Sequence, residues 1–277
     1  MNRIFRILIS LVIVCGGYKQ VISQKGAEAG IWIGAAHYFG DLNNLYRLNE
    51  PGLAIGTTLR YNFNTRLSAR IQFNYFRLRA HDTKSSNAFD VRRNLNFFSD
   101  NFEAAPSLEF NFFTYRHGSD DAFITPYMFA GLSFFHFKPK TEYQNEIVSL
   151  RELGTEGQLP GSEYASISGA WLIGGGVKLD LSYRWSLNFD LGYRSSFTDY
   201  LDDVSTVYPN ASELLSAHGP IAVELSDRSI PGLNNEKMGK PGFQRGDSND
   251  KDAYVTFGVN LVYFFGRLPC PPISIPN

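Results

Sequence analysis

The chain has 277 residues, of which 43% are hydrophobic and 15% aromatic, and its formal net charge is -1. The near-zero charge argues against a general nucleic-acid binder, which needs a basic surplus to displace counterions. A mean hydropathy of -0.20 excludes a helical transporter, which needs repeated apolar runs of about 20 residues. The two cysteines cannot form a disulfide-knotted scaffold. The length suits a large all-β barrel.

The N-terminus has the pattern of a secretory signal peptide. A short basic stretch precedes the apolar run Ile7–Cys15, which is too short to span a bilayer as a helix. Cleavage is expected after Ser23, so residues 1–23 form the predicted signal. Lipidation of Cys15 is the alternative, but Val14 is not the small residue that a lipobox needs before its cysteine. The pattern predicts a secreted, periplasmic or outer-membrane protein.

After the signal, apolar and polar residues alternate with the period of two that is typical of β-strands. In the clearest segment, Trp185, Leu187 and Phe189 fall on one face and Ser186 and Asn188 on the other. The facing is ambiguous in the first and fifth segments. Alternation predicts eight strands, at about 27–36, 55–63, 67–75, 108–112, 122–137, 167–181, 184–194 and 253–265.

The connections between these strands alternate in length, which is the pattern of outer-membrane barrels. The short connections are expected near 63–65, 115–121 and 180–183. The long connections are expected at about 37–50, 80–97, 138–165 and 196–252. We therefore predict an all-β fold over residues 24–266: an eight-stranded up-and-down antiparallel transmembrane β-barrel with long extracellular loops and short periplasmic turns. An even strand number places both termini in the periplasm.

In such a barrel the apolar face meets lipid and the polar face lines the lumen. Eight strands enclose a space that side chains roughly fill, so no open pore is expected. The charged residues predicted to face inward, and to pair across the lumen, are Arg60, Arg70, Glu109, Lys178, Asp180, Asp190 and Arg194. The aromatic residues expected to form interfacial girdles are Tyr61, Phe63, Phe112, Phe113, Tyr183, Trp185, Tyr193, Phe264 and Phe265. The alternative is a soluble β-sandwich or lipocalin-like barrel, in which the apolar face would turn inward.

Few residues suggest chemistry. Asp199, Asp202 and Asp203 could bind Ca²⁺, but a turn in which the carboxylates accept backbone amides explains them more simply. Gly174–Gly176 lies within a strand, so it predicts close packing or bending of the sheet rather than a phosphate loop. The tripeptide Arg245-Gly246-Asp247 is short enough to occur by chance.

Catalytic and metal sites are not expected. No two of the histidines have a metal-ligand spacing, and no motif groups Ser, His and Asp into a triad. We expect no enzyme activity, no metal or other cofactor, no nucleic-acid partner and no small-molecule substrate. The five histidines are His37, His81, His117, His136 and His218.

The C-terminal segment 267–277 is predicted to be a periplasmic Pro/Cys tail. Its prolines prevent further strand pairing and stiffen an extended chain. Cys270 would be the single cysteine of the mature chain, so it is either a free thiol or half of an intermolecular disulfide with a periplasmic partner. We take Arg267, Pro269, Cys270 and Pro271 as the candidate interaction residues.

Several segments together resemble the PorG-like outer-membrane barrels of the type IX secretion system. Their order and spacing, rather than any one of them, carry the resemblance, which covers nearly the whole mature chain. The segments are His37–Asn43, Thr125–Phe137, Leu153–Gln158, Phe197–Val204, Leu225–Ile230, Arg245–Asp247 and Pro269–Cys270.

The resemblance implies an accessory subunit that tethers the periplasmic ring of the secretion system to the outer membrane. The implied partners are a PorK-like or GldK-like ring lipoprotein, which is then the candidate to pair with Cys270, the PorN-like ring protein, and outer-membrane lipid. The alternative is a stand-alone small outer-membrane barrel that acts in adhesion or envelope integrity through its long loops.

Overall fold

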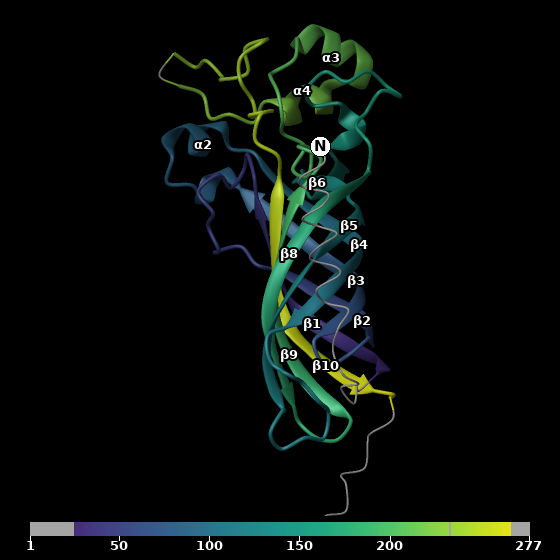
Figure 1. Ribbon diagram of the computed structural model, residues 1–277. Helices are drawn as coiled ribbons and strands as arrows, with labels where there is room; N and C mark the ends of the chain where they lie inside the picture. Colours follow the sequence, from purple (N-terminus) through teal and green to yellow (C-terminus); the bar gives the residue numbers. More distant parts are fainter. Residues whose placement is uncertain (1–24, 233, 267–277) are drawn as a thin grey trace, which may run out of the picture.

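A computed structural model describes residues 25–232 and 234–266. Within that part of the chain, eight long strands form the wall of one antiparallel barrel (Figure 1). The predicted signal peptide and the predicted Pro/Cys tail lie outside the described residues. The wall strands are β1 (Gly26–Phe39), β2 (Gly52–Asn62), β3 (Leu67–His81), β4 (Asn96–Asn111), β5 (Ile124–His136), β8 (Ile167–Asp180), β9 (Trp185–Ser196) and β10 (Ala253–Phe264).

The barrel closes because β1 pairs with both β2 and β10. The other wall strands pair antiparallel with their neighbours in the chain, and β5 pairs with β8. Closure satisfies the backbone N–H and C=O groups along the wall, which lipid cannot do for an open sheet edge. The predicted fold class, including the up-and-down order of the strands, is confirmed.

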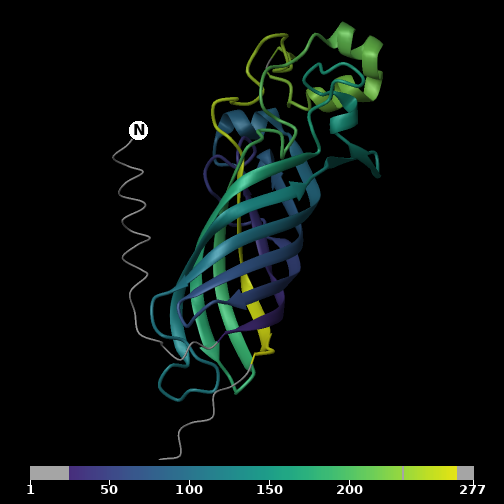
Figure 2. The ribbon, with the colours of Figure 1, turned by 45° about the vertical axis from the view of Figure 1, so that its right-hand side comes forward.

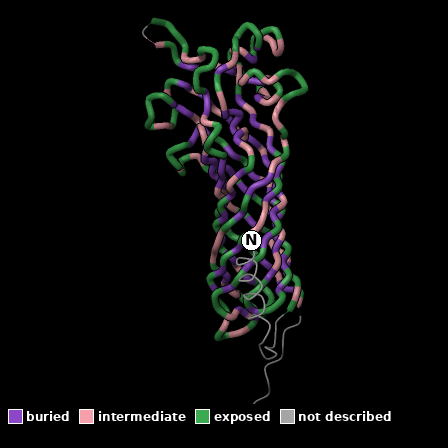
Figure 3. Tube along the Cα trace, turned by 45° about the horizontal axis from the view of Figure 1, so that its top comes forward, coloured by how far each residue is buried: buried purple, intermediate pink, exposed green. Residues whose placement is uncertain are grey.

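Side chains alternate across the wall as predicted. On β1, for example, Trp32 is buried in the lumen, whereas its neighbours Ile31 and Ile33 are exposed on the outer surface. The soluble alternative is wrong, because the large apolar side chains of the wall point outward and the charged ones inward. Figure 3 shows the result as alternating buried and exposed segments along the barrel.

One predicted girdle residue has the opposite facing. Phe264 is completely buried, and its ring stacks on the ring of His117 with 4.5 Å between centroids. The reason is the strand period of two: Tyr263 and Phe265 face outward, so Phe264, between them, must face the lumen. The other predicted girdle aromatics are exposed.

The short and long connections lie at opposite ends of the barrel (Figure 2). Turns 63–66, 112–123 and 181–184 close one end, where β1 begins and β10 ends. At the other end the four long loops, 40–51, 82–95, 137–166 and 197–252, fold together into a cap. This arrangement agrees with the predicted topology and places the described ends of the chain on the side of the short turns.

The cap contains regular structure that the alternation of the sequence did not predict. A small hairpin of β6 and β7 extends the wall sheet, because β6 pairs with the upper part of β4. Short helices occupy the other loops. The cap elements are η1 (Asp82–Lys84), α2 (Ala88–Arg93), β6 (Pro139–Tyr143), β7 (Glu146–Ser149), η2 (Arg151–Leu153), α3 (Ala211–His218) and α4 (Pro220–Ser226). No helix among the described residues has the length and apolar character needed to cross a membrane.

The outward facing of Val259 gives a direct test of the fold. Val259 lies midway along β10, opposite Ile33 on one side and Phe189 on the other. Val259→Arg should destabilise the folded barrel by about 2–4 kcal/mol, because it places a charge in mid-bilayer hydrocarbon. Denaturant-dependent folding into liposomes measures this free energy. Leu159→Arg, in the exposed cap, is the control, and equal stability of the two variants would contradict the lipid facing of β10.

Candidate functional site

The lumen of the barrel is filled by an ion-pair network. Glu109 lies at its centre, 2.7 Å from Arg60 Nε, 3.1 Å from Arg70 Nε and 2.6 Å from Lys178 Nζ. Arg60 also pairs with Glu28 at 2.5 Å, and Arg70 with Asp190 at 3.1 Å. These side chains come from opposite walls, so the network crosses the lumen.

A second group fills the lumen closer to the cap. Glu103 pairs with Arg194 at 3.1 Å and accepts hydrogen bonds from Ser133, Asn74 and Tyr254. The seven charged side chains predicted to face inward all do so and are almost fully buried. Buried side chains thus fill this part of the lumen, as expected for a barrel of eight strands.

The predicted role of Gly174–Gly176 is also confirmed. A Cβ on Gly174 would lie 2.2 Å from the Phe129 ring, and one on Gly176 would lie 1.9 Å from the Phe189 carbonyl oxygen. Side chains at these positions would therefore clash with the neighbouring strands. The glycines allow close packing within the sheet, as expected of glycine inside a strand.

The periplasmic end is closed by a histidine that the sequence analysis did not single out. His117 belongs to the turn 112–123, which folds back into the mouth of the barrel. Its ring nitrogens lie 2.7 Å from Asp180 Oδ1 and 3.0 Å from Glu28 Oε1, and Gly118 N donates to Asp180 at 2.6 Å. No signal in the sequence marks this residue, because its partners are distant in the chain.

At the extracellular end, two buried arginines connect all four loops of the cap. Arg93 of α2 pairs with Asp82 at 2.8 Å and donates to the carbonyl oxygens of Asp41 and Arg245, each at 2.8 Å. Arg245 in turn pairs with Glu156 at 3.0 Å and donates to the Asp203 carbonyl at 2.6 Å. Each long loop therefore supplies at least one residue to this network.

The cap is joined to the barrel through the hydroxyl group of Tyr38. This group lies 2.6 Å from both Asp202 Oδ2 and Asp252 Oδ1. Two carboxyl oxygens therefore face the single proton that this hydroxyl can donate. Burial, together with the charge of nearby carboxylates, raises the pKa of both aspartates well above its ordinary value.

The predicted turn, in which carboxylates accept backbone amides, is seen for Asp202 alone of the three aspartates, and Asp199 accepts from the Ser205 hydroxyl instead. Asp202 accepts from Val204 N and Leu42 N, and Asp203 accepts from Thr155 and Tyr164 side chains. The alternative of a cation site has no support within residues 25–232 and 234–266, where no group of three His, Cys, Asp or Glu side chains has the geometry to hold a metal. Arg245 is buried, so the tripeptide 245–247 is not presented as an exposed ligand.

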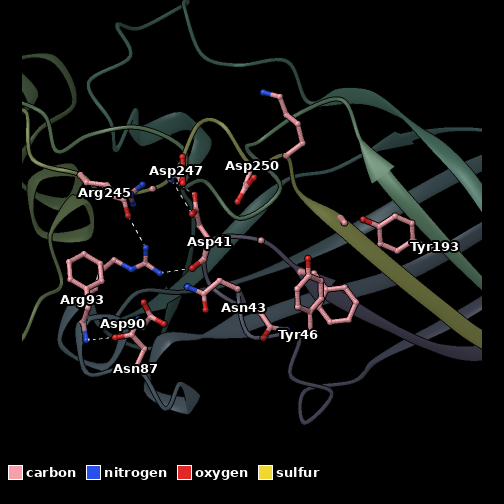
Figure 4. Close-up of a pocket in the computed structure, with 18 residues that line it drawn as sticks. Asp41, Asn43, Tyr46, Asn87, Asp90, Arg93, Tyr193, Arg245, Asp247 and Asp250 are labelled. Atoms are coloured by element: carbon pink, nitrogen blue, oxygen red, sulfur yellow. Dashed lines mark hydrogen bonds between the residues drawn. The ribbon is translucent and has the colours of Figure 1, made fainter.

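The cap also contains a cavity of about 460 Å³ (Figure 4). It lies between the loop 40–51, helix α2 and the segment 244–251, and Tyr193 of β9 reaches it from the barrel wall. Its polar lining mixes carboxylates, amide side chains and cations, and aromatic rings form much of the remainder. The labelled residues that line it are Asp41, Asn43, Tyr46, Asn87, Asp90, Arg93, Tyr193, Arg245, Asp247 and Asp250.

The candidate interaction residues Arg267, Pro269, Cys270 and Pro271 lie outside the described residues, so the hypothesis of an intermolecular disulfide stays a prediction. The described chain leads to this segment from the periplasmic end, where β10 ends at Phe264.

A protein-family model, described as "Domain of unknown function (DUF6089)", matches residues 2–218, most of the chain. The chain belongs to this family. No curated protein matches it. A closed barrel with an apolar outer wall and a charged interior is the form in which β-proteins cross the outer membrane, and this member of the family is an outer-membrane protein.

Solved outer-membrane proteins have similar folds at low sequence identity. OprG of Pseudomonas aeruginosa is 10% identical, with a TM-score of 0.42 and coverage of 90% of this chain and 100% of that one. Neisserial surface protein A is 11% identical, with a TM-score of 0.41 and coverage of 88% and 98%. The N-terminal barrel domain of P. aeruginosa OprF is 9% identical, with a TM-score of 0.37 and coverage of 86% and 99%.

The buried acids make cap stability depend on pH. Burial raises the pKa of Asp199 from 3.8 to about 7, and the pKa of Asp41 and Asp203 to about 6. Between the unfolded and folded pKa values the folded cap holds more protons than the unfolded chain, so its stability falls as pH rises.

We therefore predict that the cap resists proteolysis better at about pH 5 than at about pH 8. Asp199→Asn removes one of these ionisable groups and should reduce the difference in cleavage rate between the two pH values. Rates of cleavage within 197–252, measured at both pH values on the folded barrel with correction for protease activity, check this. Asp120→Asn, on an exposed periplasmic turn, should leave the difference unchanged. A cap that becomes more resistant as pH rises would contradict the prediction.

Proposed function

We propose that this outer-membrane barrel is a sealed structural anchor, rather than a channel or an enzyme. The observation that carries the proposal is the filled lumen: the charges around Glu109 are paired, and His117 fills the periplasmic mouth. A protein built in this way holds surfaces at both sides of the membrane without passing solutes. The cap supplies the outer surface, and the periplasmic turns supply the inner one.

Two roles fit such an anchor. The first is a stand-alone role in adhesion or envelope integrity through the cap, which is supported by the network that fixes the four loops on one another. The second is the tether of a type IX secretion ring, for which the support is the resemblance to PorG-like barrels in the ordered segments from His37–Asn43 to Pro269–Cys270. In the second role the partners are a PorK-like or GldK-like lipoprotein and a PorN-like protein.

Solute uptake by proteoliposomes tests the anchor itself. Liposomes with the wild-type barrel should swell no faster in a small sugar than empty liposomes, because the Arg60–Glu109 pair helps to fill the lumen. The double variant Arg60→Ser with Glu109→Ser should increase swelling. The matched control, Arg77→Ser with Asp100→Ser, removes an ion pair of the outer face and should leave the swelling rate unchanged. Rapid swelling with the wild-type barrel would reject the sealed anchor.

Purification from native outer membranes in mild detergent separates the two roles. For a tether, ring lipoprotein and ring partner should accompany the barrel, and a high-mass band on a non-reducing gel should disappear in Cys270→Ser. Cys270→Ala is the second variant, to separate loss of the thiol from effects of the new side chain. Recovery of the barrel alone, with no band that depends on Cys270, would contradict the tether and leave the role in adhesion or envelope integrity.

A further inference from the structure

The outer wall of the barrel is covered at one place near its extracellular end. Ile31 and Ile33 on the outward face of β1 are 59% and 56% exposed, as expected for lipid-facing side chains. His37 and Phe39 share that outward face, because they follow at the same period of two, yet they are only 4% and 7% exposed. Something other than lipid therefore covers the upper part of β1.

The cover includes the loop 40–51, the part of the cap that turns back beside the wall. The Tyr46 ring lies against the Phe39 ring, with 5.1 Å between centroids. The loop is the purple segment outside the wall below α2 in Figure 1, and Figure 4 shows that Tyr46 and Tyr193 line the same cavity. The loop thus occupies space directly next to the lipid-facing wall.

Hydrogen bonds hold this loop in a fixed shape. The Asn43 side chain donates to the carbonyl oxygens of Tyr38 at 2.7 Å and Arg47 at 2.9 Å, and it accepts from Arg47 N at 3.0 Å. Arg47 Nη2 also donates to the Leu42 carbonyl at 2.8 Å. Tyr46 has a φ of 52°, a left-handed conformation that is rare for a residue with a large side chain. The clamp around Asn43 keeps the loop in this strained form.

The clamped loop presents apolar side chains outward and turns its cation inward. Leu45, Tyr46 and Leu48 are 50%, 68% and 65% exposed, whereas the Arg47 guanidinium bonds to the loop itself. A loop in water normally has the reverse arrangement. The loop adjoins the lipid-facing wall, because Tyr46 packs on Phe39 of the outward face of β1, and Leu53 at the start of β2 is exposed as well. Contiguous exposed apolar surface of this kind marks a site of interaction.

We propose that the loop 40–51 inserts Leu45, Tyr46 and Leu48 into the outer leaflet of the outer membrane. The lipid is the occupant that the geometry favours, because the loop prolongs the surface that the barrel wall already shares with lipid. Tyr46 suits the boundary, since its ring is apolar and its hydroxyl is polar. The loop would set the height and tilt of the barrel in the membrane, and it would hold the cavity behind it at the lipid surface. This inference does not depend on either role proposed above.

A fluorescent label in the loop tests the insertion. Leu48→Cys, in mature protein carrying Cys270→Ser, is labelled with the polarity-sensitive dye NBD and folded into nanodiscs with or without lipid spin-labelled near the headgroup. Leu159→Cys, equally exposed in the loop 137–166, is the control. The spin-labelled lipid should quench the label at position 48 several-fold more than at position 159, and the emission at position 48 should lie at shorter wavelength.

Two results would overturn the proposal. Quenching at position 48 by aqueous iodide, with no effect of the spin-labelled lipid, would place the loop in water. Short-wavelength emission that neither quencher affects would place it against protein, such as a second copy of the chain. Leu45→Cys repeats the measurement at a second position, and the different mobility of folded and heat-unfolded barrels on a gel shows that each labelled variant has folded.

Discussion

The pairing of Glu109 with Arg60, Arg70 and Lys178 is the interaction on which the rest of the structure depends. A barrel in lipid must turn its apolar side chains outward, so its charges are confined to the lumen, with little water to solvate them. Buried charges are tolerated only when they are paired and hydrogen-bonded. The charges around Glu109 satisfy one another across a narrow lumen, so the same side chains that stabilise the barrel also fill its interior.

The cap follows the same principle outside the membrane. Arg93 and Arg245 are each surrounded by carbonyl oxygens and carboxylates from different loops. Loops of this length would otherwise be free to move independently, and these buried cations fix them on one another and on the barrel. The cap is therefore a shaped surface with a polar cavity at the extracellular end of the barrel.

The fold was predictable from local sequence, whereas the contacts that define the site were not. The alternation of Trp185, Leu187 and Phe189 with polar residues fixes both the strand and its facing, because the strand period is a local property. Phe264 shows the limit of an assignment from residue type. Its aromatic ring alone predicts an outward girdle position, but Tyr263 and Phe265 on either side face outward, so the strand period turns Phe264 into the lumen. The partners of Arg93, Arg245 and His117 come from loops far apart in the chain. No spacing in the sequence could reveal them.

The lumen network also constrains the order of events during assembly. Arg70 and Asp190 are 120 residues apart, and the Trp32 indole, which donates to Asp190 at 2.7 Å, is 158 residues from it. Such pairs join early strands to late ones, so they cannot form until β10 has met β1. A half-inserted sheet would expose unpaired charges toward hydrocarbon, at a cost that grows with each strand added. Insertion and closure should therefore occur as a single concerted step, with the growing sheet kept away from lipid until its last strand is in place.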